Sequence, residues 1–373
     1  KALYLVYLSY RQNIFLQNIN AYIASKLFKI YLNQPYIEFS KFKKSKLIKH
    51  LTSDISFFNT FSNGIISLTT EVGLLIAILL TIIYIDPISA LIMGGLFITF
   101  SSVFYFFSKT KVGQWGDIRN ELIEKDSSIS LEGLSGFREL LIFQKFDFFI
   151  KNYTSNRLSL SNVQAKMNTL SILPRHYLEF ITILVFIIFI LFKLNEGINI
   201  SSLIPTIGIF IAASFKIIPS INKIIIASQN IKFYSNSIDI LIKEIGLQKN
   251  IKPSGIIDTK KDNFPKQNIQ LKNISFSYDN DNVLENLDLL IEMGKSIGFI
   301  GKSGEGKSTL IDLISGIITP SNGTISIDSY DYEVMPEFMK NHIGYISQNV
   351  FLFDASIAQN ITMTTTKYNS TQE

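Results

Sequence analysis

Long stretches without a charged side chain occupy most of the first two-thirds of the sequence. A helix needs about 20 mainly apolar residues to cross a bilayer, so these stretches predict four membrane-spanning helices. The predicted spans are residues 55–85, 87–108, 172–194 and 200–227. Any one of them could be a buried core helix, but four in succession favour a membrane protein. Only 17% of the residues are charged, against roughly 25% in soluble domains.

The positions of lysine and arginine predict how the spans are oriented. Short turns at YIDPIS (84–89) and KLNEGIN (193–199) separate two pairs of spans and carry Lys193 alone. The long segments at the opposite ends of the spans, 41–49 and 109–175, are rich in lysine and arginine. Positive charge is retained on the cytoplasmic side during insertion, so these segments are predicted to be cytoplasmic. The net charge of +5 then follows largely from topology, and no nucleic-acid partner is expected.

The segments outside the predicted spans are expected to be helical too. Residues 1–32 are periodic and aromatic, and they predict the cytoplasmic half of a fifth helix. Residues 109–170 contain no proline and remain periodic, so helices should run well out of the membrane. Within them, GFRELLIFQKFDFFIKNY (136–153) is either a surface that docks on a partner domain or an amphipathic helix packed in its own bundle. Trp115 and the aromatic residues of 100–107 are expected to be interfacial anchors.

The character of the sequence changes after residue 244. Proline, glycine, lysine and aspartate mix in 244–268, which predicts a linker. Short alternating segments follow and predict strands of a soluble α/β domain, at 269–278, 283–292, 296–301 and 323–329. The absence of cysteine excludes disulfides and thiolate metal sites. Because the sequence starts at Lys1 rather than methionine, we expect it to be a fragment.

A glycine-rich motif, GKSGEGKS at 301–308, matches the phosphate-binding pattern G-x-x-x-x-G-K-[ST]. Its glycines let the backbone curl so that successive N–H groups point at one phosphate. A helix expected from about Ser308 adds the positive end of its dipole. Lys307 would place a positive charge on the β- and γ-phosphates, and the Ser308 hydroxyl would ligate Mg²⁺. A chance glycine-rich turn is disfavoured by the flanking sequence. An apolar segment precedes the motif, and STLIDLISGII, which begins within the motif, continues after it.

The order of motifs in this region resembles the nucleotide-binding domain of ABC transporters. SFSYDN precedes the glycine-rich motif, and PSNGTISID and IGYISQNVFLFDASIAQNI follow it. The resemblance implies ATP and Mg²⁺ as cofactors, with Tyr278 stacked on the adenine ring. It implies that Gln348 is a catalytic residue that touches Mg²⁺ and the attacking water, with Ser308 as the other metal ligand. Contacts to the nucleotide are implied for Tyr278, Gly301, Lys302, Ser303, Gly304, Glu305, Gly306, Lys307, Ser308 and Thr309.

The first two-thirds of the sequence resembles the membrane half of type IV ABC exporters. The implied fold class is an α-helical transmembrane bundle followed by a truncated α/β P-loop NTPase domain. An N-terminally incomplete transmembrane domain of about five helices would cover 1–247 and a linker 248–268. A C-terminally truncated nucleotide-binding domain would cover 269–373. Coupling helices that press on the ATPase domains would lie near 34–50 and 134–150.

Within this family, the membrane half is most similar to bacterial flippases for lipid-linked oligosaccharides, through segments 68–80, 174–191 and 204–225. The resemblance implies an ATP-driven flippase subunit that crosses the bacterial inner membrane several times and holds its nucleotide-binding domain in the cytoplasm. A second half-transporter, in the simplest case an identical chain, would complete it. Export of peptides, other lipids or drugs is the alternative, as is an inactive fragment that only binds nucleotide. The apolar runs disfavour a soluble ABC protein.

Several motifs that complete an ABC ATPase do not occur between Gln348 and Glu373. These are the LSGGQ-like signature loop, the Walker B aspartate, the catalytic glutamate and the switch histidine. We therefore expect these 373 residues to bind nucleotide without hydrolysing it, whereas the full-length parent would be an ATPase.

The charged side chains inside the predicted spans include Glu71, Lys216 and Lys223. Glu71 is either a functional acid or an acid hydrogen-bonded to a neighbouring helix. Lys216 and Lys223 are seven residues apart, and so roughly on one helix face. They either meet an anionic pyrophosphate head group or simply enter the cytoplasmic half of the helix. The sequence leaves both alternatives open.

Overall fold

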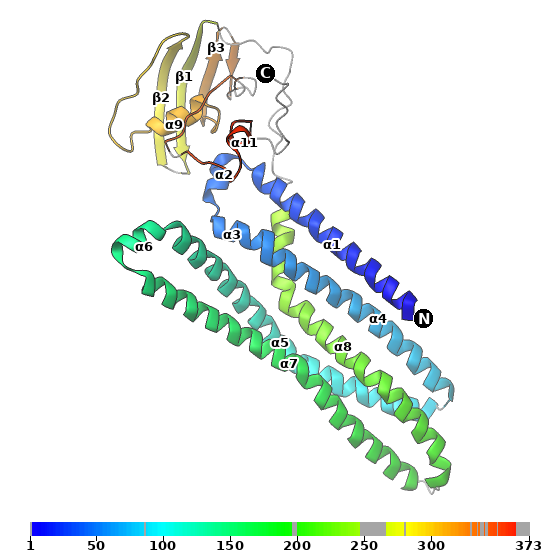
Figure 1. Ribbon diagram of the computed structural model, residues 1–373. Coiled ribbons are helices and arrows are strands. Elements are labelled where there is room, and N and C mark those ends of the chain that lie inside the picture. Colours follow the sequence, from blue (N-terminus) through cyan, green and yellow to red (C-terminus); the bar gives the residue numbers. More distant parts are fainter. Residues whose placement is uncertain are drawn as a thin grey trace. The chain divides into compact units, whose positions relative to one another are not determined.

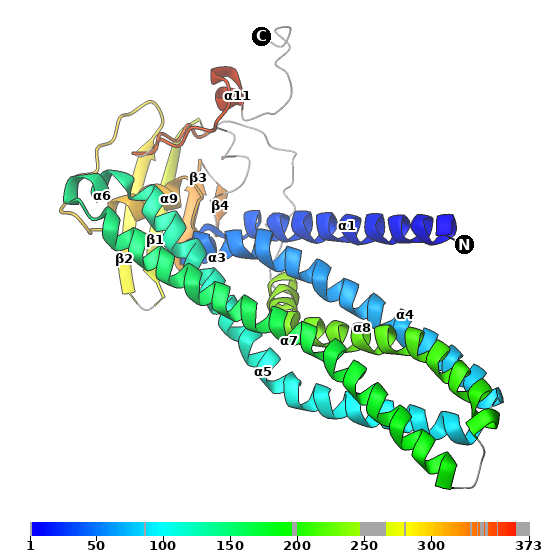
Figure 2. The same ribbon diagram turned by 60° about the horizontal axis from the view of Figure 1, so that its bottom comes forward.

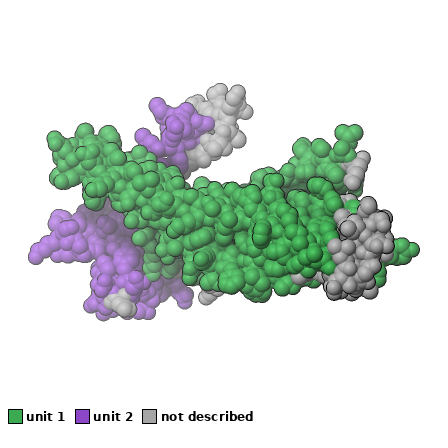
Figure 3. All heavy atoms as spheres, turned by 90° about the horizontal axis from the view of Figure 1, so that it is seen from below, with its two compact units in different colours: residues 1–34, 38–251 green, residues 35–37, 252–373 purple. Residues whose placement is uncertain are grey.

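Long helices form the first part of the computed structural model, and a four-stranded sheet forms the second (Figure 1). The structure describes residues 2–85, 87–195, 200–246, 266–279, 281–328, 330–333, 335, 339, 342–348 and 350–362. Figure 3 distinguishes two units, of which unit 1 is residues 1–34 and 38–251 and unit 2 is residues 35–37 and 252–373. The domain boundaries proposed from the sequence stay a prediction, since most of the expected linker 248–268 lies outside the described residues.

Five long helices are described in unit 1, and each predicted span lies within one of them. Their bounds are α1 (Ala2–Leu32), α4 (Ile55–Ile85), α5 (Pro87–Ser135), α7 (Phe146–Asn195) and α8 (Ile200–Gly246). The expected helical extensions beyond the spans are therefore present. Among the described residues, two helical stretches are long and apolar enough to cross a membrane, Lys44–Tyr84 and Phe146–Ile188. The spans predicted at 87–108 and 200–227 are helical but include side chains outside the described part.

Short helices occupy the two segments where coupling helices were expected. The first segment holds α2 (Tyr36–Lys41), α3 (Lys44–Lys49) and the π-helical turn η1 (His50–Asp54), and the second holds α6 (Phe137–Phe143). α6 buries none of its side chains. Phe137, Ile142 and Phe143 are all exposed. Of the two alternatives for 136–153, the structure therefore favours a surface over a helix packed in its own bundle.

The long helices of unit 1 pack in pairs. α5 and α7 lie side by side as a long hairpin closed by α6, and α4 lies along α8 (Figures 1 and 2). The apolar core between the spans is built mainly from aliphatic side chains of three helices: Ile82, Leu178, Ile181, Ile217, Ile221 and Ile225. Close packing of these branched side chains holds the predicted membrane segments together.

A buried polar network joins the end of α1 to η1 and α8. The Tyr31 hydroxyl lies 2.8 Å from His50 Nδ1 and donates to Glu244 Oε2 at 3.2 Å. Lys49 Nζ donates to Asp54 Oδ2 at 3.2 Å, and both side chains are inaccessible to solvent. Buried charges are costly unless they are paired, so these contacts specify how the three helices meet.

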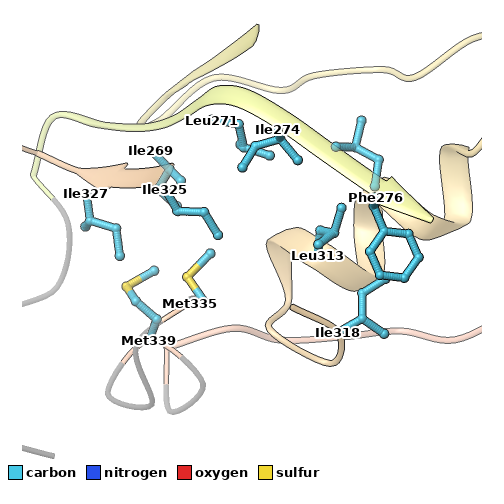
Figure 4. Close-up of a cluster of buried hydrophobic side chains, with 11 residues drawn as sticks. Ile269, Leu271, Ile274, Phe276, Leu313, Ile318, Ile325, Ile327, Met335 and Met339 are labelled. Atoms are coloured by element: carbon cyan, nitrogen blue, oxygen red, sulfur yellow. The ribbon is translucent and has the colours of Figure 1, made fainter. Parts of the chain in front are cut away.

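The sheet of unit 2 is antiparallel, with the order β2-β1-β3-β4. Its strands are β1 (Asn268–Tyr278), β2 (Asp281–Glu292), β3 (Asn322–Ile327) and β4 (Tyr330–Tyr332). Alternate side chains of β1 face inward, among them Ile269, Leu271, Ile274 and Phe276 (Figure 4). A register shift between Leu271 and Ile274, where Asn273 has a φ of 51°, keeps both halves of the strand apolar on the same face.

Hydrogen bonds of Asp328 connect the start of β1 to the end of β3. The carboxylate of Asp328 accepts hydrogen bonds from the backbone N–H groups of Lys266 at 3.0 Å and Gln267 at 2.8 Å. These hydrogen bonds hold the pKa of the Asp328 carboxyl below its usual range, since they favour the charged form. The last residues of the expected linker, Lys266 and Gln267, are thereby tied to the sheet.

The strand predicted at 296–301 is not present. This segment is described, but it pairs with no other strand, and the Ile300 side chain is fully exposed. An apolar alternating pattern makes a strand only where a neighbouring backbone accepts its hydrogen bonds, and the four described strands bond only to one another. The other three predicted strands are found in β1, β2 and β3, with Ser329 outside the described residues. The short β4 was not predicted.

Candidate nucleotide-binding site

Two glycines give the loop at 301–308 its shape. Gly304 has a φ of 90° and Gly306 a φ of 81°, in the left-handed region that glycine adopts without strain. Gly306 caps α9 (Lys307–Ile314). A Cβ on Gly306 would lie 3.0 Å from side-chain atoms of Val283 and Leu284 in β2. The loop therefore turns into the helix directly against the sheet, where a larger residue would be strained by its φ and crowded by these side chains.

Packing against the sheet sets the orientation of α9. Leu310 and Leu313 are buried in the core that β1 and β3 contribute, and Figure 4 shows Leu313 facing that core. Thr309 is also buried, whereas Ser308 is exposed. The start of the helix, with its free N–H groups, thus lies next to the loop, and the predicted metal ligand Ser308 is accessible.

The ammonium group of Lys307 is held over the loop. Its Nζ donates hydrogen bonds to the backbone carbonyl oxygens of Gly301 at 2.7 Å and Lys302 at 2.5 Å. The loop backbone and a positive charge therefore meet at one place, as binding of a phosphate requires. Of the predicted site residues, the structure brings together those of the loop and the start of α9.

The loop also contains an acid that bonds to its own backbone. Glu305 Oε2 accepts a hydrogen bond from the backbone N–H of Lys302 at 2.8 Å. One donor expected to point at a phosphate is thus taken by a carboxylate. This contact was not predicted, because the pattern G-x-x-x-x-G-K-[ST] leaves the position of Glu305 unspecified.

Replacing Glu305 with glutamine should strengthen ATP binding. The Glu305 carboxylate competes with a phosphate for the Lys302 N–H, and its negative charge repels the phosphate. An exposed charge contact is worth up to about 1 kcal/mol, which corresponds to roughly a fivefold change in affinity. Equilibrium titration with a fluorescent ATP analogue measures the effect. Glu292→Gln, which removes a carboxylate at the far end of β2, is the matched control. Binding of Glu305→Gln that is equal to or weaker than that of the control would contradict this interpretation.

Tyr278 and Gln348 lie on other elements. Tyr278 ends β1, and its ring packs edge-on against Phe276 with centroids 4.8 Å apart. Its side chain is 37% exposed, which leaves ring surface for a base. Gln348 is exposed in the segment 342–348, and within the described residues no hydrogen bond links it to the loop. The roles proposed for both side chains therefore stay predictions.

A magnesium site here would need few protein ligands. Among the residues that the structure describes, no group of three or more His, Cys, Asp or Glu side chains could hold a metal. Mg²⁺ is commonly held by one or two side chains together with nucleotide phosphates and water. An exposed hydroxyl at Ser308 beside the loop fits that arrangement.

A second candidate site is a cavity of about 730 Å³ between α7 and α8. Apolar side chains form most of its wall, including Ile183, Phe186 and Phe215. Its basic side chains are Arg175 and Lys223. An apolar wall with a few polar groups is typical of ligand sites, and this combination suits an amphipathic molecule.

Of the three charged residues noted in the spans, Lys223 lines this cavity. Lys223 Nζ on α8 lies 2.6 Å from Glu71 Oε1 on α4. Of the two alternatives for Glu71, the hydrogen bond to a neighbouring helix is the one observed. Arg175 is paired in turn with Glu179, one turn along α7, at 3.0 Å. Lys216 is exposed and is not part of the cavity wall.

Comparisons with known proteins agree with both parts of the chain. The family model of the ABC transporter transmembrane region matches residues 3–214, and that of the ABC transporter matches residues 284–373. An uncharacterised ABC transporter ATP-binding protein of Bacillus subtilis, YwjA, is 28% identical over 224 residues, which are 59% of this chain and 37% of that protein. The ATP-dependent lipid A-core flippase of Francisella novicida is 38% identical over 95 residues, or 25% of this chain and 16% of that protein.

The fold is shared with a solved exporter. A bacterial Atm1-family ABC exporter with ATP bound superposes with a TM-score of 0.74 at 15% sequence identity, over 94% of this chain and 62% of that chain. This chain spans a little over a third of the length of the Bacillus relative. The structural match confirms the expected fold class, a helical exporter bundle followed by part of an ABC ATPase domain.

Proposed function

This chain belongs to the ABC transporters, and we propose that it is the ATP-binding half of an exporter that moves an amphipathic substrate out of the cytoplasm. The loop at 301–308, where the Lys307 ammonium lies over a glycine-shaped backbone, is the observation that carries this proposal. The cavity between α7 and α8 supplies an apolar wall with basic side chains for a substrate. In an ABC transporter with these two features, ATP would bind at the loop and the cargo would bind in the cavity.

Each residue of the nucleotide site would have a separate role in binding ATP. Backbone N–H groups of the loop and the start of α9 would hold the phosphates, and Lys307 would neutralise their charge. Ser308 and Gln348 would orient Mg²⁺, and Tyr278 would stack on the base. The bound nucleotide supplies the free energy for transport when a second half-transporter, in the simplest case an identical chain, completes the site. This chain would then bind ATP, and hydrolysis would belong to the full-length parent in such a pair.

The substrate class that we favour is a lipid-linked oligosaccharide or polysaccharide in the bacterial inner membrane. Arg175 and Lys223 could meet a negatively charged head group while Ile183, Phe186 and Phe215 contact the lipid. The similarity to a protein named ATP-dependent lipid A-core flippase agrees with such a cargo. Peptides, other lipids or drugs are the alternative, since an apolar cavity also accepts these molecules.

Neutralising Lys216 and Lys223 together should abolish flipping and spare the ATPase activity of the full-length protein. Neither lysine lies near the nucleotide loop in sequence. Removal of both takes one of the two basic side chains, Lys223, from the cavity wall and takes Lys216 from the same helix one heptad earlier. Proteoliposomes with a fluorescent lipid-linked oligosaccharide measure transport, and phosphate release measures ATPase activity. Lys243→Gln, near the end of α8, is the matched control. Transport that survives the double substitution would show that these lysines do not bind the cargo.

The Glu71–Lys223 pair requires a further control, because loss of Lys223 leaves a carboxylate without its partner. In Glu71→Gln combined with Lys223→Gln, both charges are removed and no unpaired acid remains. We expect this pair of substitutions to be as defective in transport as Lys223→Gln alone. Restored transport would assign the pair a structural role only.

A further inference from the structure

A second cavity in unit 1 lies between α5 and α7, outside both sites described above. Its volume is about 490 Å³. Trp115 of α5 forms one wall, and α7 supplies Asn162, Lys166, Thr169, Leu170 and Leu173. Trp115 also packs against the buried cluster of Val112, Val163, Met167 and Phe233, so this wall of the cavity is fixed by the core beneath it.

The depth of this cavity relative to the predicted spans is the same on both helices. Lys166 precedes the predicted span of α7 by six residues, and Trp115 follows the predicted span of α5 by seven. At 1.5 Å per helical residue, both lie roughly 10 Å beyond the ends of the predicted spans. Lipid head groups occupy roughly the first 5–8 Å outside the hydrocarbon core, so both residues lie at the outer edge of that layer.

Polar and apolar side chains are ordered along the cavity. Asn162 and Lys166 form the end that points away from the predicted span, and Leu170 and Leu173 form the end next to it. A phospholipid has the same order, with a polar phosphate outside and acyl chains inside. Tryptophan prefers this boundary, because its ring is apolar and its N–H can donate a hydrogen bond.

The charge at this cavity is positive and unopposed. Within the part of the chain that the structure describes, Lys166 makes no ion pair and no acidic side chain belongs to the cavity wall. Lys109 and Lys111 of α5 lie between Trp115 and the predicted span and add positive charge on the membrane side of the cavity. Basic pockets at the cytoplasmic ends of membrane helices suit anionic lipid head groups.

We propose that the cavity between α5 and α7 binds an anionic phospholipid of the cytoplasmic leaflet, with its phosphate at Lys166 and its upper acyl chain on Leu170 and Leu173. This site differs from the cargo cavity in helices, residues and charge balance, and it does not depend on the proposed transport function. A lipid wedged there would hold α5 and α7 together where the hairpin leaves the membrane.

Trp115 is the sole tryptophan of the chain, so its fluorescence reports directly on this cavity. The chain is reconstituted in phosphatidylcholine vesicles with increasing fractions of phosphatidylglycerol brominated on its acyl chains. We expect saturable quenching at low fractions of the brominated anionic lipid, and only gradual quenching when brominated phosphatidylcholine replaces it. Inorganic phosphate at millimolar concentration tests whether the head-group chemistry alone suffices, and we expect it not to compete.

Substitutions assign the quenching to Lys166. Lys166→Gln should require about fivefold more anionic lipid for half-maximal quenching, the factor expected for one lysine near an anionic head group. Lys166→Arg should restore the wild-type curve, and Lys151→Gln, on the same helix but outside the cavity, should not change it. Equal quenching by both lipids, full competition by inorganic phosphate, an unquenched tryptophan or identical curves for Lys166→Gln and Lys151→Gln would each overturn the proposal.

Discussion

Replacing Lys307 with alanine should weaken ATP binding by about 10- to 100-fold. The Lys307 ammonium is the positive charge placed over the loop, and a hydrogen bond to a charged group contributes roughly 1.5–3 kcal/mol. The same substitution also removes two hydrogen bonds to loop carbonyls, so the backbone that should hold the phosphates loses its internal support. Titration of the membrane-reconstituted chain with a fluorescent ATP analogue measures the loss.

Two further variants separate charge from position in this experiment. Lys295→Ala removes a lysine from the turn that precedes the loop segment and should bind ATP like the wild type. Lys307→Arg retains the charge, but its planar guanidinium cannot replace a compact ammonium, so binding should remain weak. Wild-type affinity in Lys307→Ala would show that the loop does not bind phosphate through this side chain.

Gly116→Ala should be among the most damaging changes in the helical unit. A Cβ at Gly116 would overlap the carbonyl oxygen of Phe233 and lie 3.1 Å from its carbonyl carbon. These are backbone atoms of α8, so α5 and α8 would have to separate. Overpacking of a core costs about 1–3 kcal/mol, and the gain in helix propensity from alanine offsets only about 1 kcal/mol. We expect a net loss of up to about 2 kcal/mol in the free energy of unfolding.

Gly113→Ala on the same helix is the matched control. There a Cβ would meet only the Lys232 side chain, at 2.8 Å from its Cε, and that flexible chain can move aside. Gly113→Ala should therefore be neutral or slightly stabilising, because alanine favours helix over glycine. Thermal unfolding of the detergent-solubilised protein compares the two variants. Equal midpoints would mean that α5 and α8 do not approach as closely at Gly116 as the structure shows.

The helical architecture could be predicted from the sequence, because the length of an apolar run indicates whether a helix can cross a bilayer. The break predicted at 84–89 agrees with the end of α4 at Ile85 and the start of α5 at Pro87, where proline is tolerated. The loop at 301–308 was accessible for a similar reason, since phosphate binding demands glycines and a lysine at fixed spacing. Both features are local in the chain, and local patterns are visible without a structure.

Contacts between residues that are far apart in the sequence could not be predicted from it. The partner of Glu71 is Lys223, 152 positions away, and no spacing rule connects them. The guanidinium of Arg119 is buried and stacks at 4.1 Å over Phe57 and 4.6 Å over Phe233, although the sequence shows it only as one cation among many. The alternation at 296–301 predicted a strand, but alternation cannot reveal whether a partner strand is available.

ATP-driven movement of an amphipathic molecule across a bilayer tests the proposed function most directly. Proteoliposomes are prepared with the full-length protein, and a fluorescent lipid-linked oligosaccharide is followed through its accessibility to an added quencher. We predict movement that requires hydrolysable ATP, stops with a non-hydrolysable analogue and is absent in Lys307→Ala. Movement at one rate with and without ATP, or an undiminished rate in Lys307→Ala, would contradict an ATP-driven exporter.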